Sequence, residues 1–270
     1  MTTTTSNRAG EVILRGGFTN DGLITRVGET VRRPWRPTST ATKALLEHLD
    51  EVGFSGAPRF LGVDEHGREV LSYIPGAAAV EPYPDWALTD EALVSVAGLL
   101  RRYHDAVMSF DGGEYSWPLS VPEVFADGII SHNDPNLDNV IFAGGQAVAL
   151  IDFDLASPGS VVWDVACAAR LWAPLRKEGD VPRQLRGRSL DRLRLFVDAY
   201  GMTDERDRAR VVDAMGYAHD WCYAVVRRAV ARGHGPFERM WRAGGERRAR
   251  RTRRWIAGHE AEMRAALGVR

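Results

Sequence analysis

Short apolar runs alternate with Gly- and Asp-containing turns near the start of the chain. After a Thr-rich segment that we expect to be a disordered tail (residues 1–10), the pattern predicts strands within EVILRGG, LITRV, ETVRRP, PRFLGVD and REVLSYI. Between the third and fourth, TATKALLEHLDEVG repeats apolar residues at helical spacing and ends at Gly53. Residues 11–75 are therefore predicted to form a small β-rich lobe with one helix.

The pattern changes after the Pro75-Gly76 pair, and residues 76–88 have the composition of a linker. A long amphipathic helix is predicted within LTDEALVSVAGLLRRYHDAVMSF, capped at Thr89 or Asp90. Short strands follow in GIISH, NVIFAGG and AVALIDFD, and then mostly helical segments up to a terminal helix. Residues 89–270 thus form a larger helical lobe with a small hairpin, and the fold class is α+β.

Composition narrows the class of protein. With 270 residues, 44% hydrophobic and 26% charged, the chain is long enough for a large core, so we expect a soluble globular protein. The two cysteines, Cys167 and Cys222, form no C-x-x-C pair, which favours a reducing cytoplasm over a disulfide framework or zinc site. No apolar run approaches the roughly 20 residues of a spanning helix, so no membrane partner is expected.

Charge is distributed unevenly along the chain. Residues 1–164 contain 11 Lys and Arg against 23 Asp and Glu, whereas residues 165–270 contain 24 against 13. The basic excess is greatest in RAGGERRARRTRRW, where Arg occupies most helical positions at once and alternates with Ala and Glu. This arrangement favours a solvated terminal helix over a nucleic-acid site, so no nucleic-acid partner is expected.

Candidate chemistry is concentrated in SHNDPNLDNVIF, a loop between two apolar segments, and in ALIDFD, where the next apolar run ends. The loop fits the pattern H-x-D-x-x-x-x-N. In phosphoryl transfer, such a set divides into an Asp that accepts the acceptor's proton, an Asn that holds a magnesium and a strand-end Asp that bridges metals and phosphates. All three residue types are present in that order.

The same residues also have a purely structural interpretation. Asp and Asn are common in turns because their side chains bond to nearby backbone, so the loop pattern alone is weak. Its position gives it weight: the strand, the loop, a hairpin and a strand ending in Asp152 all follow a β-rich lobe.

This combination resembles the aminoglycoside phosphotransferase family of kinase-like enzymes, in the residues SHNDPNLDNVIF and LIDFDLASPGSVVWDVACA. The resemblance implies a two-lobed protein-kinase-like fold, ATP or GTP as phosphate donor, and Mg²⁺. It implies Asp134 as catalytic base, and Asn139 and Asp152 as magnesium ligands. His132, Asp154 and Asp164 are then structural supports of the site, although Asp154 could also contact the metal.

The nucleotide-binding residues are less regular. LSYIPG matches the family's linker region, which implies that the backbone of Ser72, Tyr73 and Ile74 contacts the purine. The usual strand Lys is missing, so the phosphate-contacting cation is Arg32 or Arg33; strand alternation turns only one of them inward, and Arg32 is favoured. Register places Thr42 where the family has the partner glutamate, with Glu47 further along the helix. GGFTNDG is either a phosphate loop or a plain hairpin.

The acceptor is expected to be a small hydroxylated molecule, because the chain between Asp152 and Asp164 is too short for a segment that docks a peptide. In the family, acceptors are held by the C-terminal helices. Candidates there are Trp172, His219, Asp220, Trp221 and Tyr223. Each also has a packing interpretation, since tryptophans and tyrosines at helical spacing usually belong to the core. The basic balance of this half favours an acceptor less cationic than a typical aminoglycoside.

The segment TRVGETVRRP also resembles a subset of the family described as trifolitoxin-immunity-like, which implies a role in resistance or self-protection. We therefore expect a nucleoside-triphosphate-dependent small-molecule kinase. The alternatives are a non-catalytic kinase-like binding or immunity protein, favoured by the missing Lys, and a metabolic kinase for a sugar or amino-alcohol.

Overall fold

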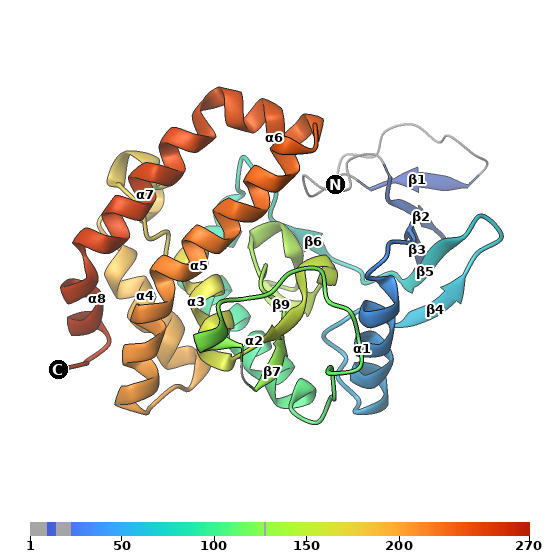
Figure 1. Cartoon of the computed structure of the whole chain (residues 1–270), viewed down its shortest axis with the longest axis horizontal. Helices are drawn as coiled ribbons and strands as arrows, with labels where there is room; N and C mark the ends of the chain where they lie inside the picture. Colours follow the sequence, from blue (N-terminus) through green and yellow to red (C-terminus); the bar gives the residue numbers. More distant parts are fainter. Residues whose placement is uncertain (1–9, 15–22, 127) are drawn as a thin grey trace.

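A computed structural model describes residues 10–14, 23–126 and 128–270 of the chain. Within these ranges an antiparallel sheet of five strands, in the order β1-β2-β3-β5-β4, forms one end of the molecule (Figure 1). Its strands are β1 (Glu11–Ile13), β2 (Thr25–Val27), β3 (Thr30–Pro34), β4 (Phe60–Val63) and β5 (Arg68–Ser72). The pattern of short apolar runs predicted all five.

Helix α1 (Ser39–Glu51) packs beside this sheet with Leu45, Leu46 and Leu49 almost fully buried. The sequence predicted an apolar face with Leu45 and Leu49, and these two are buried, whereas Val52, expected on the same face, is 47% exposed. The chain leaves the helix at Gly53, whose φ of +79° is the left-handed conformation that glycine adopts at low cost. The first lobe is therefore a sheet with one helix.

Helix α2 (Asp90–Val107) opens the second lobe. Thr89 is its N-cap, since its hydroxyl oxygen accepts a hydrogen bond from the backbone N–H of Ala92 at 3.1 Å. Next to α2 lies a small sheet in the order β6-β8-β9, formed by β6 (Ala77–Ala78), β8 (Val140–Ala143) and β9 (Gln146–Leu150). A second pair joins β7 (Ile129–Ser131) to β10 (Ser157–Gly159). These short strands anchor the loops that connect them, and these loops lie between the two ends of the molecule.

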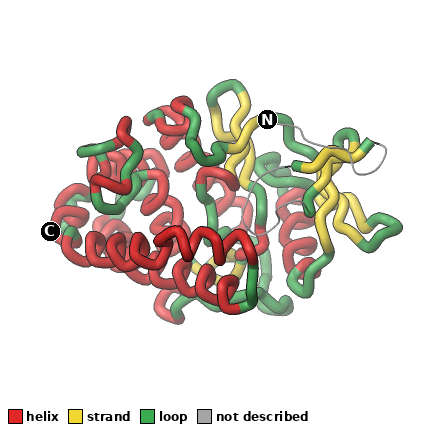
Figure 2. The backbone as a smooth tube through the Cα atoms, turned by 90° about the horizontal axis from the view of Figure 1, so that it is seen from above, coloured by secondary structure: helices red, strands yellow, loops and turns green. Residues whose placement is uncertain are grey.

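The remaining helices form the other end of the molecule, opposite the five-stranded sheet (Figures 1 and 2). They are α3 (Val161–Trp172), α4 (Ser189–Tyr200), α5 (Glu205–Ala231), α6 (Gly235–Met240), α7 (Glu246–Gly258) and α8 (Glu260–Ala266). Helix α3 is apolar almost all round and is buried accordingly, with Trp163 and Trp172 at most 2% exposed. Each such side chain contributes roughly 2–3 kcal/mol through its burial.

The terminal helix differs from the prediction. Instead of one continuous helix, a π-helical turn at Trp241–Gly245 with Gly244 at a φ of +95° precedes α7, and a break at His259 separates α7 from α8. In the part of the chain that the structure describes, no helix combines the length and apolarity required to cross a bilayer. The architecture is the two-lobed, kinase-like α+β fold that the sequence predicted.

Candidate active site

Asp164 holds the loop that follows β7. Its carboxylate is fully buried and accepts hydrogen bonds from the backbone N–H groups of His132 and Asn133, each at 2.8 Å. The His104 ring nitrogen Nε2 lies 3.0 Å from the same carboxylate. Burial alone would raise the pKa of Asp164, but these hydrogen bonds and the neighbouring His104 and His132 outweigh it and lower the pKa. The ionised carboxylate of Asp164 therefore holds the backbone of this loop in place at His132 and Asn133.

Asn133 occupies a left-handed backbone position, with a φ of +67°. Asn tolerates this conformation better than most residues with a side chain. Its amide nitrogen donates to the Leu155 carbonyl at 2.7 Å, and its amide oxygen accepts from Trp163 Nε1 at 2.7 Å. The buried His132 ring adds a contact of 3.1 Å to the Ile151 carbonyl.

Asp134 lies at the tip of this braced loop. Asn139 donates through Nδ2 to Oδ2 of Asp134 at 3.0 Å, and Asn136 donates to Oδ1 at 3.1 Å. Burial, together with the charges of Asp152 and Asp138, raises the pKa of the Asp134 carboxyl to about 8. A carboxylate with a pKa near neutrality is suited to accept a proton from a hydroxyl.

Asp152 follows β9 in a left-handed conformation, with a φ of +62°. Such strained non-glycine positions persist only where the surroundings enforce them and are concentrated at functional sites. Its Oδ1 atom is buried and accepts no hydrogen bond from the described residues. Within the described part of the chain, Oδ1 of Asp152 is therefore a buried acceptor without a hydrogen-bond donor, close enough to Asp134 to raise the pKa of its carboxyl.

The donor set fits a hard divalent cation. Asn139 uses its amide nitrogen toward Asp134, so its amide oxygen is the atom that could bind a metal. The described part of the chain holds no group of three His, Cys, Asp or Glu side chains that could bind a metal by themselves. One carboxylate and one amide oxygen are nevertheless typical for Mg²⁺, which keeps waters and takes further oxygens from phosphates.

Arg33 reaches this site from strand β3 in the other lobe. Its side chain is only 7% exposed; it forms an ion pair with Asp154, and its Nη1 lies 3.8 Å from Oδ1 of Asp152. Arg36 Nε lies 3.6 Å from Asp154 as well. Asp154 thus joins Arg33 on β3, and Arg36 in the segment after that strand, to the segment after β9.

The preference for Arg32 as the inward cation is wrong. Arg32 points away from Asp152: its Nη1 donates to the Thr30 hydroxyl at 2.6 Å, and its Nε lies 3.5 Å from Asp64. Strand alternation sends Arg33 to the opposite face, toward the carboxylates.

Arg33 also pairs with an acidic residue of its own sheet, Glu69 on β5, which no sequence pattern indicated. Its Oε2 lies 2.9 Å from Arg33 Nε, its side chain is 3% exposed, and it accepts a hydrogen bond from the Ser39 hydroxyl at the start of α1. Glu47, one of the two positions considered on the helix, instead pairs with Lys43 at 3.0 Å near the surface. Thr42, the other, is buried and carries no charge. The candidate phosphate loop GGFTNDG lies outside the described residues.

The backbone that is proposed to bind the purine lies at the end of strand β5, in the same sheet. The backbone N–H groups of Ser72 and Tyr73 donate to the carbonyls of Arg59 and Glu29, each at 2.9 Å. Among the three, Ile74 lies beyond the end of β5 at Ser72 and outside this ladder. Of these three residues, Ile74 is therefore the residue whose backbone N–H forms no such hydrogen bond within the sheet.

The five acceptor candidates are not gathered at one point. The buried Trp172 donates from Nε1 to the Pro135 carbonyl at 2.9 Å and so contacts the loop that carries Asp134. The four candidates on α5 contact other elements: His219 the Ala249 carbonyl, Asp220 the Arg253 guanidinium, Trp221 the Ser120 carbonyl and Tyr223 the Trp241 ring. These contacts favour a packing role for the four.

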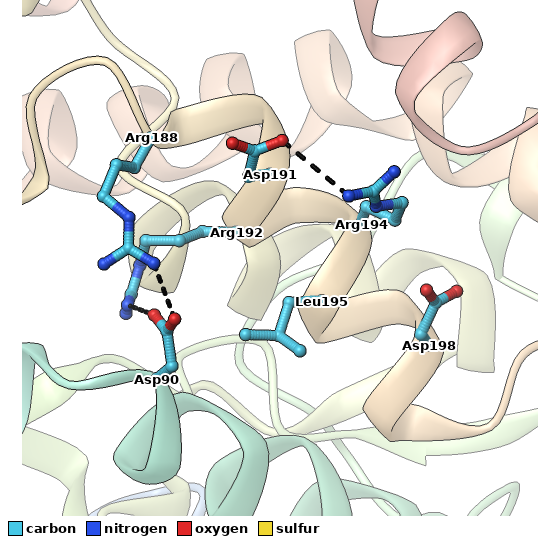
Figure 3. A pocket seen from close by; sticks show the side chains of 7 residues that line it. All are labelled: Asp90, Arg188, Asp191, Arg192, Arg194, Leu195 and Asp198. Atoms are coloured by element: carbon cyan, nitrogen blue, oxygen red, sulfur yellow. Dashed lines mark hydrogen bonds and ion pairs between the residues drawn. The ribbon is translucent and has the colours of Figure 1, made fainter.

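A cavity of about 470 Å³ lies away from this loop, between the start of α2 and helix α4 (Figure 3). Arg188 and Arg192 both point at Asp90, with nitrogen–oxygen distances of 2.6 Å (Figure 3). Asp191 and Arg194 form a further pair at 3.9 Å. Because these charges are neutralised within the cavity wall and no candidate catalytic residue lines it, we do not assign the chemistry to this cavity despite its size.

Comparisons with known proteins relate the chain to a family and to individual relatives. Residues 114–200, which include Asp134, Asn139, Asp152 and Asp164, match the model of the family described as "Phosphotransferase enzyme family". The trifolitoxin immunity protein of Rhizobium leguminosarum bv. trifolii is 32% identical over 266 residues, which cover 95% of this chain and 98% of that protein.

Solved structures share the fold at lower identity. A choline/ethanolamine kinase family protein from Mesorhizobium loti is 15% identical with a TM-score of 0.60, covering 90% of this chain and 88% of that one. Aminoglycoside 2'-phosphotransferase-IIIa, solved as a GDP complex, is 13% identical with a TM-score of 0.57, covering 92% and 91%. The trifolitoxin immunity protein, which matches almost the whole chain at 32% identity, and the family model over residues 114–200 together show that the chain belongs to the aminoglycoside phosphotransferase family.

Proposed function

We propose that this protein transfers the γ-phosphoryl group of ATP or GTP, with Mg²⁺, to a hydroxyl group of a small molecule. The observation that carries the proposal is the grouping of Asp134, Asn139 and Asp152 opposite Arg33, a cation from the other lobe. A base, two oxygen ligands and a phosphate-neutralising cation are the parts that phosphoryl transfer requires.

In this proposal, Asp134 accepts the proton of the attacking hydroxyl. Asn136 and Asn139 hold its two carboxylate oxygens, and Asp164 braces the backbone before it, so the base is positioned before the acceptor arrives. Removing water from around Asp134 raises its pKa and so increases its tendency to take the proton.

Asn139 and Asp152 are the proposed magnesium ligands. When bound, Mg²⁺ would neutralise charge that develops on the phosphate oxygens. Glu69, Asp152 and Asp154 carry three negative charges around the two guanidinium groups of Arg33 and Arg36, so the charge balance of the site favours one further cation. Arg33 is proposed to contact the phosphates, and Ile74 to contact the purine through its backbone.

A non-catalytic immunity protein is the second candidate, because the relative that is 32% identical over 266 residues is called an immunity protein. Such a protein would bind its target without a chemical step. A binder has no need of a strained Asp152 or of a desolvated Asp134, and for this reason we favour the enzyme. We propose that the enzyme acts in the cytoplasm and that its role is resistance or self-protection.

The test is phosphoryl transfer itself. The protein is incubated with Mg²⁺, ATP or GTP and a mixed panel of antibiotics and hydroxylated metabolites, and the compounds are then weighed by mass spectrometry. We expect one compound to gain a phosphoryl group with the wild type but not with Asp134→Asn. Asp138→Asn, which removes another carboxylate of the same loop, is the control and should still transfer the group. Equal transfer by Asp134→Asn would refute the base assignment, and bound nucleotide without any transfer would favour the immunity protein.

A further inference from the structure

The guanidinium group of Arg33 is held by carboxylates from both lobes. Glu69, on strand β5 of the first lobe, stands opposite Arg33 with its Oε2 2.9 Å from Nε. Asp154, in the segment after β9 of the second lobe, accepts a hydrogen bond from Nη2 through its Oδ1. Two of the guanidinium nitrogens are therefore bound, each by a different lobe.

The remaining nitrogen, Nη1, is the one nearest to Asp152. It lies 3.8 Å from Oδ1 of that carboxylate, which is beyond hydrogen-bond distance, and this oxygen accepts no hydrogen bond from any described residue. Since Asp152 is a proposed metal ligand, Nη1 is the nitrogen closest to the proposed phosphate site. The two bound nitrogens thus determine the orientation of the third.

Asp154 is anchored through its two neighbours in sequence. Phe153 is buried, and its ring centroid lies 4.6 Å from that of His132 in the loop after β7. The carbonyl of Leu155 accepts a hydrogen bond from Nδ2 of Asn133, in the same loop, at 2.7 Å. The backbone on both sides of Asp154 is therefore attached to the loop that carries the proposed base.

Glu69 is equally anchored in the first lobe. It lies within strand β5, its side chain is almost fully buried, and the Ser39 hydroxyl at the first turn of α1 donates to its Oε1. A guanidinium group between two anchored carboxylates loses rotational freedom, because charge-assisted hydrogen bonds orient it. A lysine has one nitrogen on a flexible stem and would lack this orientation, so the arrangement requires an arginine.

We propose that Asp154 is a positioning residue: it holds the two lobes together at Arg33 and, with Glu69, orients Nη1 of Arg33 toward the nucleotide phosphates. This inference rests on the proposed function, in which Arg33 contacts phosphate. It leads to an expectation opposite to that of simple electrostatics. A carboxylate near phosphates repels them, so if charge alone mattered, its removal would strengthen triphosphate binding. If Asp154 positions Arg33, its removal weakens that binding.

The first measurement needs no nucleotide. In protein with isotope-labelled arginine, a guanidinium group that cannot rotate gives separate NMR signals for its two Nη groups. We expect separate signals for Arg33 in the wild type and averaged signals in Asp154→Ala, and Arg33→Lys assigns these signals by their loss. Asp180→Asn, which breaks a carboxylate–arginine pair with Arg251 elsewhere in the second lobe, is the matched control and should leave them separate. Averaged signals in the wild type, or separate signals that persist in Asp154→Ala, would overturn the proposal.

Calorimetric titration of the full chain in the presence of Mg²⁺ then measures the effect on binding. ATP and GTP are compared with adenosine and guanosine, which lack phosphates. Asp154→Ala should weaken the preferred triphosphate about tenfold and leave its nucleoside unchanged, whereas Asp180→Asn should change neither. Equal or tighter triphosphate binding by Asp154→Ala, or an equal loss of the nucleoside, would contradict a positioning role.

The same substitution in the Arg33→Lys background separates positioning from metal binding. If Asp154 acts through Arg33, Asp154→Ala should weaken the triphosphate there by about twofold or less, because the two effects do not add. A further loss of about tenfold in that background would mean that Asp154 acts independently of Arg33, as a metal ligand does, and would refute the inference. These outcomes contradict the inference alone. A wild type that binds neither triphosphate contradicts the proposed function, and the inference with it.

Discussion

Arg33 and Glu69 stand directly opposite each other on strands β3 and β5, with Arg33 Nε 2.9 Å from Glu69 Oε2. The glutamate that holds the strand cation therefore comes from the same sheet and not from helix α1. The Ser39 hydroxyl at the first turn of α1 bonds to Glu69, so the helix still contributes to the pair. Both charges are almost fully buried, and each depends on the other.

Arg33→Gln is expected to reduce both stability and nucleotide affinity. The change leaves Glu69 as a buried, unpaired charge, which typically costs about 3–5 kcal/mol. Arg32→Gln is the matched control. Arg32 Nε lies 3.5 Å from Asp64, and the loss of this pair should reduce the free energy of unfolding by about 1 kcal/mol or less. Urea denaturation and calorimetric titration with ATP and GTP measure the two effects. Nucleotide affinity that falls in Arg32→Gln but not in Arg33→Gln would reverse the assignment.

Asn133 provides a test of backbone strain in the loop. Both Asn133→Gly and Asn133→Ala lose the side-chain bonds to Leu155, Ser157 and Trp163. Both must adopt the φ of +67°, but this conformation costs alanine, which has a Cβ, roughly 1 kcal/mol or more and costs glycine little. We expect the alanine variant to be less stable than the glycine variant by about that amount in chemical denaturation. Equal stability of the two would show that the backbone relaxes at this position.

His219 makes the stability of the protein depend on pH. Burial, assisted by the charge of Arg170, lowers the pKa of His219 to about 4, while the unfolded chain has a pKa near 6.5. Between these values the unfolded state binds a proton that the folded state does not, so stability falls as the pH is lowered from 6.5 to 4. The loss through this residue is at most about 3 kcal/mol.

His219→Gln should flatten that part of the stability curve, because glutamine takes up no proton and can still donate to the Ala249 carbonyl. Urea denaturation at several pH values between 4 and 7 measures the slope. The exposed His66→Gln serves as control and should keep the slope of the wild type. A slope that His219→Gln leaves unchanged would assign the dependence to other groups.

Trp172→Phe separates a positioning role from acceptor binding. The change removes the hydrogen bond to the Pro135 carbonyl, worth about 1 kcal/mol, and loosens the backbone beside Asp134. We expect the transfer rate at saturating acceptor to fall by about tenfold or more, because small misplacements of a base are costly. The KM of the acceptor should stay the same. A raised KM with an unchanged rate would instead make Trp172 an acceptor contact, as the sequence suggested.

Hydrophobic periodicity predicted much of the fold. Strands β1 to β5 and helices α1 and α2 follow alternation or helical spacing that a single sequence displays. Strands β6 and β10 were not predicted, because they span two and three residues and β10 contains Pro158. The break of the terminal helix depends on Gly244 in a left-handed conformation, which the dense arginine pattern around it obscures.

The site was predictable where its residues are close in sequence. Asp134, Asn139 and Asp152 lie within one motif and the strand that follows it. Glu69 is far from Arg33 in sequence, and its role depends on the register of β3 against β5, which alternation does not determine.

Metal-dependent nucleotide binding is the measurement that tests the proposed site most directly. ATP and GTP are titrated calorimetrically into the wild type and Asp152→Asn, with Mg²⁺ and with a chelator. Asparagine tolerates the left-handed backbone at position 152, so this variant should fold and lose only the carboxylate. We predict that one nucleotide binds the wild type in a Mg²⁺-dependent way. The same nucleotide should bind Asp152→Asn at least about tenfold more weakly. If neither nucleotide binds the wild type, or if Asp152→Asn binds as tightly with the same metal dependence, the proposed phosphotransferase site is contradicted.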